Sequence, residues 1–450
     1  MLRHKQPCGL EKRKNEREYL TMVREKKESQ IKKACNFGLA HHKITRDEMN
    51  KKSPLCKSKC NFDNGQNSGK NFNRTNTLFL TLPRRINFTQ LTKWGERNEA
   101  TYHNWFKQDL DLVSFNRQLI DEHGSGSHFV IFDPSFISKS GKKTPNKGTF
   151  WSGGASKSKQ GLEMSAFAVA DIKQHTAYHL TSTFTTPPQE LKKEGKTLID
   201  YYVSQVKVNE LHIKHFGNLL VADTYFGMTT FVTPVLKMGI DLISCLKSNS
   251  CLYYVPTPPT NKLPVGRPRK KDGKIDWNNV DNARLPIVYQ DSEKIVRSAK
   301  VYVKCLLMNV VLVAVDYLKK DGTLQTRKLY FSTRLEHEWL FVLDSYQCRF
   351  QIEFLFRDAK QFTGLMQCQS KNETKLLNHI NLSLTTISVA KVTHWEQDKP
   401  FSMQEIKSYY HNLKMVELFS EALGLDTNSI KNNPKIISIL QSNTYEAIAA

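Results

Sequence analysis

The segment HFVIFD at residues 128–133 decides how the chain folds, because an unbroken apolar run ends there in an acid. The segment NLLVAD at residues 218–223 repeats the pattern. Short apolar runs bounded by turn residues are typical of buried strands. A helical pattern at residues 189–208 lies between the two segments, so the sequence predicts an α/β fold.

Further predicted elements extend this core. Strands are expected at residues 164–171 and 177–184, and with 128–133 they would form an antiparallel meander. A helix at 226–238 and a strand at 240–246 follow the second acid-ending segment. This strand, helix, strand order implies that the two strands are parallel neighbours.

Residues 248–325 interrupt the α/β pattern. They begin with a stretch rich in Pro, Gly and Lys, and continue with strand-like runs at 300–308 and 310–318 and a turn at 319–322. We interpret them as a β-rich insertion. From Leu335 to the end helices dominate, and breaks between them are expected near Gly364, Pro400 and Gly424.

A small helical module is predicted before the first strand. Residues 77–125 carry apolar side chains at helical spacing, with Asn87 as a candidate N-cap and Gly95 as a break. Arg84 and Arg85 form a basic entrance to this module. The pattern favours DNA binding and a helical cap on the next domain equally.

The charge of the chain favours a polyanionic partner, either nucleic acid or an anionic membrane surface. The 450 residues have a formal net charge of +23. Residues 1–76 hold nearly half of this charge and few β-branched or aromatic residues, which predicts a largely disordered extension with one helix at 11–33. The extension is an electrostatic arm, or it is dispensable, since Met22 and Met49 are alternative starts.

Cysteine usage and apolar content indicate a cytoplasmic protein. The 9 cysteines are an odd number without regular spacing, and the first residues lack the apolar core of a secretory signal. The longest apolar stretch, 305–318, is too short to span a membrane. Cys56 and Cys60, with His41 and His42 nearby, match a zinc site only weakly.

Three carboxylates are candidates for a common site. Asp133 and Asp223 each end a predicted strand, and they would lie side by side if those strands pair. The preference of turns for Asp explains either residue alone equally well. Glu353 would supply the third carboxylate. Crowded carboxylates repel one another, so at least one should have a raised pKa in the absence of metal.

The segment from Tyr346 to Lys360 places polar residues on one helix face. At about 100° per residue, Arg349, Glu353 and Lys360 fall close to Tyr346 around the axis. A solvated charged stripe would explain the charges, but it would not select a Tyr or the neighbouring Arg357. The opposite side carries the apolar residues Ile352, Leu355, Ala359 and Phe362.

Two aspartates and a glutamate form an oxygen-only ligand set suited to Mg²⁺, with Mn²⁺ as a substitute. Two such ions roughly 4 Å apart can activate a water or a 3′-hydroxyl and stabilise the leaving oxyanion in phosphoryl transfer. Arg349 and Lys360 would then bind the DNA phosphates that flank the scissile bond, and Tyr346 would hydrogen-bond one of them.

The spacing Y-x2-R-x3-E-x6-K from Tyr346 to Lys360 resembles the YREK signature of DDE transposases of the insertion-sequence-four family, which belong to bacterial mobile elements. FDPSFISKSGKKTPNKGTFWSGG from Phe132 and VADTYFG from Val221 stand in that family's order, and the similarity spans residues 78–390. The resemblance implies a ribonuclease-H-like catalytic core, a mixed sheet flanked by helices, with a β-rich insertion, an N-terminal helical module and a helical C-terminal region.

The resemblance also implies the activity and the partners. The chain would cleave double-stranded DNA at the inverted repeats of its element and transfer the strands into target DNA, as a homodimer associated with the bacterial nucleoid. Family members flip a base onto an aromatic residue of the insertion, but we interpret Trp277, the single Trp there, as a packing residue. The implied metal ligands are Asp133, Asp223 and Glu353, and the implied contacts to end phosphates are Tyr346, Arg349 and Lys360.

Further basic residues are expected to contact DNA. The string VGRPRKK at residues 265–271 resembles an AT-hook, in which Arg267 and Arg269 would enter a narrow minor groove. A generic phosphate-binding loop explains the string as well. Lys142 and Lys143 follow the first strand along the expected DNA path, and Arg357 adds a cation beside Glu353.

Two other functions remain open. The first is a catalytically silent DNA-binding relative, that is, a repressor or a domesticated protein, although all three acids and the YREK residues are intact. The second is a different ribonuclease-H-like nuclease, such as a resolvase.

The predicted segments are the extension (1–76), the helical DNA-binding module (77–125), the first core part (126–247), the insertion (248–325), the second core part with the YREK helix (326–395) and the C-terminal helices (396–450).

Overall fold

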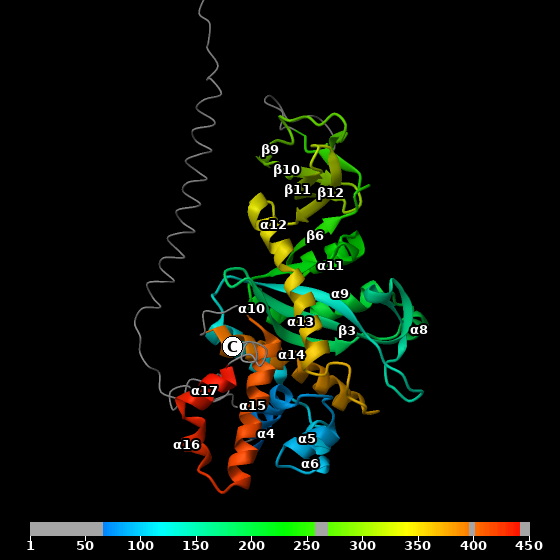
Figure 1. The fold of residues 1–450 in the computed structure, drawn as a ribbon. Helices are drawn as coiled ribbons and strands as arrows, with labels where there is room; N and C mark the ends of the chain where they lie inside the picture. The colour runs from blue at the N-terminus through cyan, green and yellow to red at the C-terminus, as the bar shows by residue number, and fades with distance from the viewer. Residues whose placement is uncertain (1–65, 257–268, 396–400, 442–450) are drawn as a thin grey trace, which may run out of the picture. The chain divides into compact units, whose positions relative to one another are not determined.

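The fold is built around one long mixed sheet, shown in Figure 1. It is seen in a computed structural model that describes residues 66–256, 269–395 and 401–441. The strand order is β2-β3-β1-β5-β6-β12-β11-β10-β7-β8, with β4 paired to β3 and β9 paired to β10. This sheet with its flanking helices confirms the predicted α/β fold class.

The first half of the sheet holds both acid-ending segments. β1 (His128–Ile137), β3 (Lys157–Asp171) and β4 (Thr176–Phe184) form the predicted antiparallel meander. β5 (Leu219–Ala222) pairs in parallel with β1, and β6 (Asp241–Leu246) pairs in parallel with β5, which confirms the predicted parallel neighbours.

One strand of this half was missing from the sequence-based prediction. β2 (Gly148–Ser152) forms a hairpin with the first residues of β3. The turn between them contains the short 3-10 helix η1 (Gly153–Ala155). Glycines and lysines around this hairpin hide the alternation that marks a strand in the sequence.

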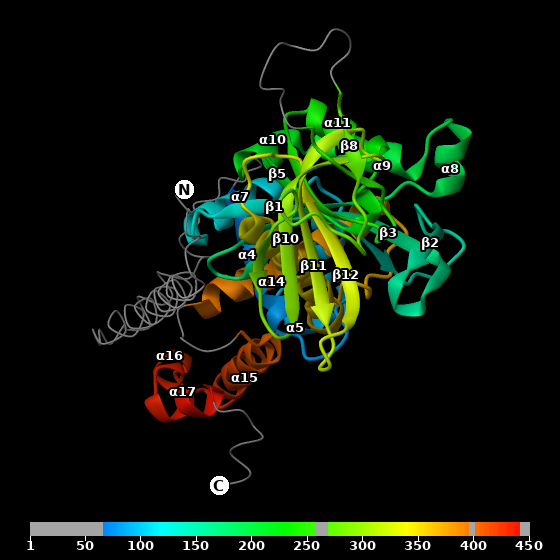
Figure 2. The ribbon, with the colours of Figure 1, turned by 90° about the horizontal axis from the view of Figure 1, so that it is seen from above.

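The insertion continues the same sheet. β12 (Leu324–Ser332) pairs with β6, so the hydrogen-bonded ladder runs from the first half into the insertion without a gap. β10 (Lys294–Val303) and β11 (Met308–Leu318) lie beside β12, as Figure 2 shows. The outer strands are β7 (Leu252–Tyr254), β8 (Asp272–Lys274) and β9 (Ile287–Gln290).

The strands of this region differ from two of the predicted bounds. The run predicted at residues 300–308 is divided, because β10 ends at Val303 and the chain then turns, with Leu307 at a φ of 58°. The predicted end of the insertion at residue 325 falls inside β12. The apolar residues of the turn obscured the first boundary, and β12 contains no break that would mark the second.

Helices cover the sheet between and after the strands. The predicted helix at 189–208 is two helices, α8 (Pro188–Lys193) and α9 (Leu198–Val208), because Gly195 with a φ of 67° breaks it. Thr197 and Asp200 form a capping box that starts α9. The remaining helices of this region are α10 (Glu210–His215), the 3-10 helix η2 (Thr224–Phe226) and α11 (Thr229–Lys237).

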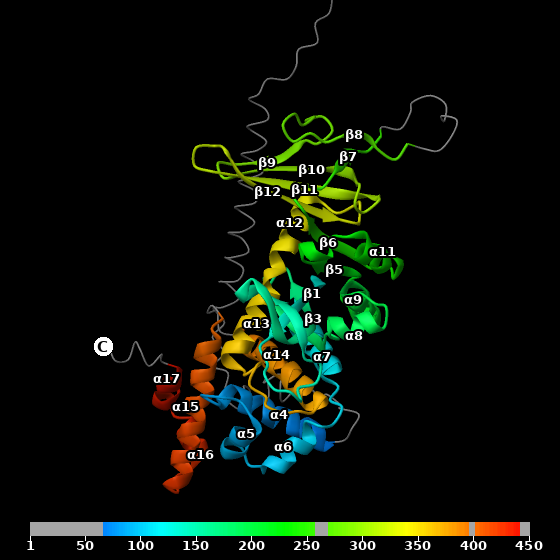
Figure 3. The ribbon, with the colours of Figure 1, turned by 90° about the vertical axis from the view of Figure 1, so that its right-hand side faces the viewer.

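The second half of the chain is helical, as predicted from Leu335 onward. Figure 3 shows α12 (Trp339–Cys348) and α13 (Phe350–Phe362) following one another along the sheet. The breaks near Gly364 and Gly424 are confirmed, whereas Pro400 lies outside the described residues. The later helices are α14 (Glu373–Trp395), α15 (Met403–Ala422), α16 (Thr427–Lys431) and α17 (Pro434–Gln441).

The N-terminal helices begin earlier than predicted. α4 (Gln66–Thr81) crosses the expected boundary at residue 77, so residues 66–76 are folded, not disordered. The cause is burial: Phe72 and Phe79 are fully buried, and α4 packs against α14 and α15. The predicted helices follow as α5 (Phe88–Trp94), which Asn87 caps, α6 (Glu99–Trp105) and α7 (Leu112–His123).

Two sequence-based predictions, one for a helix and one for a zinc site, concern residues before residue 66. The helix predicted at 11–33 and the zinc candidates Cys56 and Cys60 lie outside the described residues. Within the residues that are described, no helix is long and apolar enough to cross a membrane.

The burial of α4 predicts a measurable loss of stability. Phe72→Ala should lower the free energy of unfolding by about 3–5 kcal/mol, because it removes a fully buried ring. Urea denaturation followed by circular dichroism measures this change. Lys93→Ala, at an exposed position of α5, should stay within about 0.5 kcal/mol of the wild type. Equal stabilities for the two variants would mean that α4 is not part of the folded core.

Candidate active site

The parallel pairing of β1 and β5 brings two aspartates together. Phe132 pairs with Ala222, so the next residues are Asp133 on β1 and Asp223 directly after the end of β5. Asp223 lies just beyond β5, as predicted. Asp133 does not end its strand, because β1 continues to Ile137 along β3. It lies instead at the point where β5 stops, and there its side chain remains 18% exposed.

Tyr346 and Arg349 approach the two aspartates from the helix side. The Tyr346 hydroxyl donates to Oδ1 of Asp223 at 3.2 Å. Nη2 of Arg349 donates to Oε1 of Glu353 at 2.8 Å, and its Nη1 lies 3.9 Å from Oδ1 of Asp133. The Arg349 side chain is only 6% exposed. One buried guanidinium therefore faces carboxylates from both β1 and α13.

The predicted single helix from Tyr346 to Lys360 is divided at Arg349. α12 ends at Cys348 and α13 begins at Phe350, although Arg349 itself has helical angles of −51° and −36°. Because these angles are helical, the rotation around the axis is preserved across the junction. Tyr346, Arg349 and Lys360 consequently face the end of β5 and the neighbouring residues of β1.

Lys360 lies near the end of β1, with its Nζ 3.2 Å from the hydroxyl oxygen of Ser135. Burial lowers the pKa of Lys360, and the negative charge of Asp133 opposes this shift. Opposite this face, Ile352, Leu355 and Ala359 are fully buried. The predicted division of the helix into a polar and an apolar side is confirmed.

The other predicted DNA contacts are not gathered at the acids. Arg357 is 57% exposed and pairs with Asp358 at 3.0 Å. Lys142 and Lys143 lie exposed in the loop between β1 and β2, and Arg269 pairs with Asp272 at 3.2 Å. Arg267 lies outside the described residues.

The Trp277 ring contacts an arginine of β12. The guanidinium carbon of Arg327 lies 4.2 Å from the centre of its ring, and Arg327 also pairs with Asp316.

A fourth carboxylate near the site escaped the sequence-based prediction. Glu163 on β3 is 6% exposed, and its Oε1 accepts a hydrogen bond of 2.7 Å from the Tyr202 hydroxyl. Burial raises the pKa of Glu163, and its charge in turn helps to raise the pKa of Asp133. The available signal was a lone acid at the start of the apolar run MSAFAVA.

One carboxyl group of the site has a raised pKa, as the sequence predicted, but burial and not repulsion is the main cause. The pKa of Asp133 is raised to about 7, so at least one carboxylate is shifted as predicted. The main cause is burial, and the repulsion from Glu353, Asp223 and Glu163 adds to it. Arg349 opposes the shift. Burial lowers the pKa of Arg349, but the surrounding negative charges outweigh burial and raise it overall.

The donor chemistry of the site fits a hard divalent cation. Asp133 and Asp223 offer carboxylate oxygens side by side, and a buried carboxylate with a raised pKa gains from a nearby cation. Glu353 is held by Arg349. In the described ranges, no three His, Cys, Asp or Glu side chains lie close enough to hold a metal ion. Glu353 would have to leave Arg349 to complete such a set.

The raised pKa of Asp133 predicts a pH dependence of stability. Between its ordinary value of 3.8 and about 7, the folded chain retains a proton that the unfolded chain releases. The stabilising effect is thus complete below 3.8 and is lost as the pH rises through 7. In metal-free buffer, the wild type should lose unfolding free energy relative to Asp133→Asn across this window, as measured by urea denaturation. A constant difference between the two proteins would contradict the assignment.

Comparison with known proteins gives one family for this fold and site. No curated protein matches the chain. The family model described as transposase DDE domain matches residues 124–388, which is more than half of the chain. The match begins just before β1 and ends within α14, so it includes both aspartates and the α12–α13 region. The chain therefore belongs to the transposase DDE domain family.

Proposed function

We propose that this transposase cleaves DNA at the ends of a bacterial insertion sequence and joins the freed strands to target DNA. We further propose that it belongs to the insertion-sequence-four group, with Tyr346, Arg349, Glu353 and Lys360 as its YREK residues. The family match establishes the transposase domain. The observation that carries the finer proposal is the parallel register of β1 and β5, which makes Asp133 and Asp223 neighbours.

The proposed metal ligands are Asp133, Asp223 and Glu353. When bound, two Mg²⁺ ions, or Mn²⁺ in their place, supply a polarised nucleophile and stabilise the leaving oxygen. The chain itself contributes fixed positions for the two aspartates on paired strands. It also keeps both carboxylates in a partly buried setting, where electrostatic interactions with bound ions are stronger than in water.

Arg349 and Lys360 are the proposed contacts to the phosphates beside the scissile bond. Burial holds the Arg349 guanidinium in place beside Asp133, so the guanidinium has little freedom to lose when DNA binds, even after Glu353 turns from it to a metal ion. Lys360 lies near Ser135, two residues after Asp133 on β1. A charge-assisted hydrogen bond from either cation to a phosphate would fix the DNA relative to the aspartates. Tyr346 is proposed as a further contact to an end phosphate, and without DNA its hydroxyl donates to Asp223.

The proposed substrate is double-stranded DNA, and the proposed assembly is a homodimer that holds both element ends. Lys142, Lys143, Arg269 and Arg357 are exposed or half-exposed cations that would contact the backbone farther from the cut. Arg267 is proposed with them on sequence grounds alone. Backbone contacts of this kind carry affinity without sequence information.

Cleavage of element-end DNA tests the three carboxylates. With Mg²⁺ and a labelled duplex that carries the terminal repeat, Glu353→Gln should cut at least roughly a thousandfold more slowly than the wild type. Asp133→Asn and Asp223→Asn should be impaired to a similar degree. The readout is product formation on a denaturing gel under single-turnover conditions.

Glu421→Gln is the matched control for Glu353→Gln, because Glu421 is an exposed acid on α15. It should cut like the wild type. Wild-type rates in Glu353→Gln would exclude the proposed role of Glu353. A wild type that binds the duplex tightly and never cuts it would favour a silent DNA-binding relative.

Joining to a second DNA molecule separates a transposase from a simple nuclease. Pre-cleaved element ends with free 3′-hydroxyls, incubated with plasmid and Mg²⁺, should yield joined products in the wild type. The same triad variants should abolish joining, because both steps use the same carboxylates. Cleavage without any joined product would instead support a resolvase-like nuclease.

A further inference from the structure

A lysine lies on the apolar face of α15. Met403 and Ile406 are buried there, and Lys407 follows at a position where helical spacing predicts another apolar side chain. The residue is half-buried, and burial lowers the pKa of Lys407 to about 8. Burial is the one cause of this shift, so no carboxylate among the described residues compensates the charge. Another group must stabilise the ammonium at this place.

The ammonium group of Lys407 bonds to the ends of two helices. Its Nζ donates to the carbonyl oxygen of Phe362, the last residue of α13, at 2.6 Å. It also donates to the carbonyl oxygen of Phe79, in the last turn of α4, at 3.3 Å. The C-terminal end of a helix carries partial negative charge, so two helix dipoles stabilise this one cation.

Neither carbonyl oxygen accepts a backbone hydrogen bond within the described structure. In an α-helix Phe79 would accept from the residue four positions on, but that residue is Pro83, which has no N–H. α13 stops at Phe362, and the N–H of Leu365 turns back to Ala359 at 3.1 Å. The ammonium group therefore supplies donors that the backbone lacks at both helix ends.

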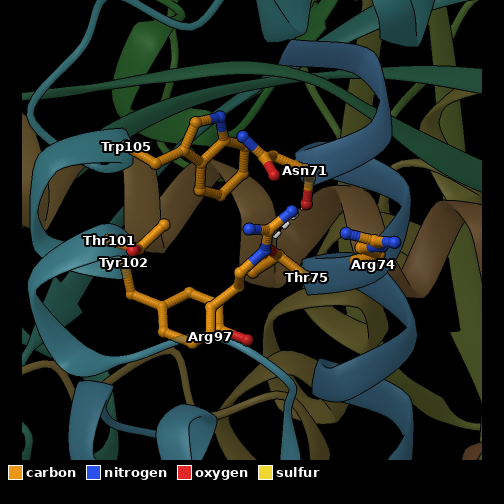
Figure 4. Close-up of a pocket in the computed structure, with 7 residues that line it drawn as sticks. All are labelled: Asn71, Arg74, Thr75, Arg97, Thr101, Tyr102 and Trp105. Atoms are coloured by element: carbon orange, nitrogen blue, oxygen red, sulfur yellow. Dashed lines mark hydrogen bonds between the residues drawn. The ribbon is translucent and has the colours of Figure 1, made fainter. Parts of the chain in front are cut away.

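α4 is a firm support for this contact. Phe72 and Phe79 are fully buried, and α4 packs against α14 and α15. Figure 4 shows a further neighbour, because Asn71 of α4 lies there beside Tyr102 and Trp105 of α6. A helix that is held by three others can fix the end of α13.

α13 carries two of the proposed site residues. Lys360 lies two residues before Phe362, and Glu353 lies in the first turn of the same helix. The other end of α13 adjoins the buried Arg349, which faces Asp133. The helix is thus held at both ends, and this determines its position along its own axis. A shift of about 1 Å at a reacting group can lower a rate by about a hundredfold.

We propose that Lys407 is a positioning residue for the cleavage reaction. It holds the C-terminal end of α13 against α4, and so keeps Glu353 and Lys360 in place relative to the two aspartates. The inference rests on the proposed function, because it assumes that these residues bind metal and phosphate. Lys407 acts through the helix and contacts neither the metal ions nor the DNA.

Single-turnover cleavage of an element-end duplex tests Lys407→Met, which removes the charge and both hydrogen bonds. At saturating DNA and Mg²⁺, the rate constant should be about tenfold lower than that of the wild type. The loss is partial, because Thr363 also donates to the carbonyl oxygen of Ser383 on α14 at 2.8 Å. The Kd for the duplex should stay within about twofold of the wild type, since only the chemical step is affected.

Lys414→Met is the matched control, because Lys414 lies on the same helix and pairs with Glu417 at 3.3 Å. It should cleave like the wild type. A residue that only stabilises the fold would change the number of active molecules, and so the amplitude of cleavage, but not the rate constant. A wild-type rate constant in folded Lys407→Met would therefore overturn the proposal, and so would equal losses in the two variants.

Lys407→Gln keeps the test decisive if the methionine variant does not fold. Its amide is a donor, but the side chain is one atom shorter than that of lysine and cannot reach both carbonyl oxygens. This variant should also cleave more slowly than the wild type. A wild-type rate constant in Lys407→Gln would again overturn the proposal.

Amide hydrogen exchange separates this inference from the proposed function. In metal-free buffer without DNA, residues 359–365 should exchange faster in Lys407→Met than in the wild type or in Lys414→Met. Faster exchange in a protein whose wild type never cleaves DNA would support the contact with α13 and contradict the proposed function. Normal wild-type cleavage, with unchanged exchange in Lys407→Met, would contradict the role of Lys407 alone.

Discussion

The candidate site depends above all on the parallel pairing of β1 with β5. Phe132 is fully buried in this register, and its ring packs 5.2 Å from that of Phe226, which follows β5. Because side chains alternate along a strand, a slip of one residue would move Phe132 to the opposite face of the sheet, away from Phe226, and would place Asp133 among the aromatic rings that Phe132 now contacts. The cost of burying a carboxylate among aromatic rings therefore fixes the register and, with it, the proximity of the two aspartates.

A second constraint is the charge balance around Arg349. A buried guanidinium is costly to place unless carboxylates face it, and Glu353 and Asp133 supply them. Tyr346 connects this group to the insertion, because its ring lies 4.8 Å from that of Tyr330 on β12. Three elements thus meet around Arg349. They are α13 with Glu353, β1 with Asp133 and, through the ring of Tyr346, β12 with Tyr330.

Sequence periodicity predicted the strands and the helix face that carry the candidate site residues. The acid-ending runs gave the strands of Asp133 and Asp223, and helical spacing gave the shared face of Tyr346 and Lys360. What they missed depends on tertiary contacts. The continuity of β6 with β12 is a long-range pairing, α4 is stabilised by packing against later helices, and the pKa of Asp133 responds mainly to burial. Glu163 was missed because its partner, Tyr202, comes from a helix that is distant in the sequence.

The pairing of β6 with β12 means that the insertion cannot be removed without damage to the core sheet. An inserted domain joined only by linkers can be excised, but here excision would leave β6 with a row of unpaired backbone amides and carbonyls. An exposed, apolar edge such as DLISCL is a template for other chains and favours aggregation. The insertion therefore protects the core that it interrupts, and a shortened transposase of this architecture would need a substitute for β12, not merely a linker.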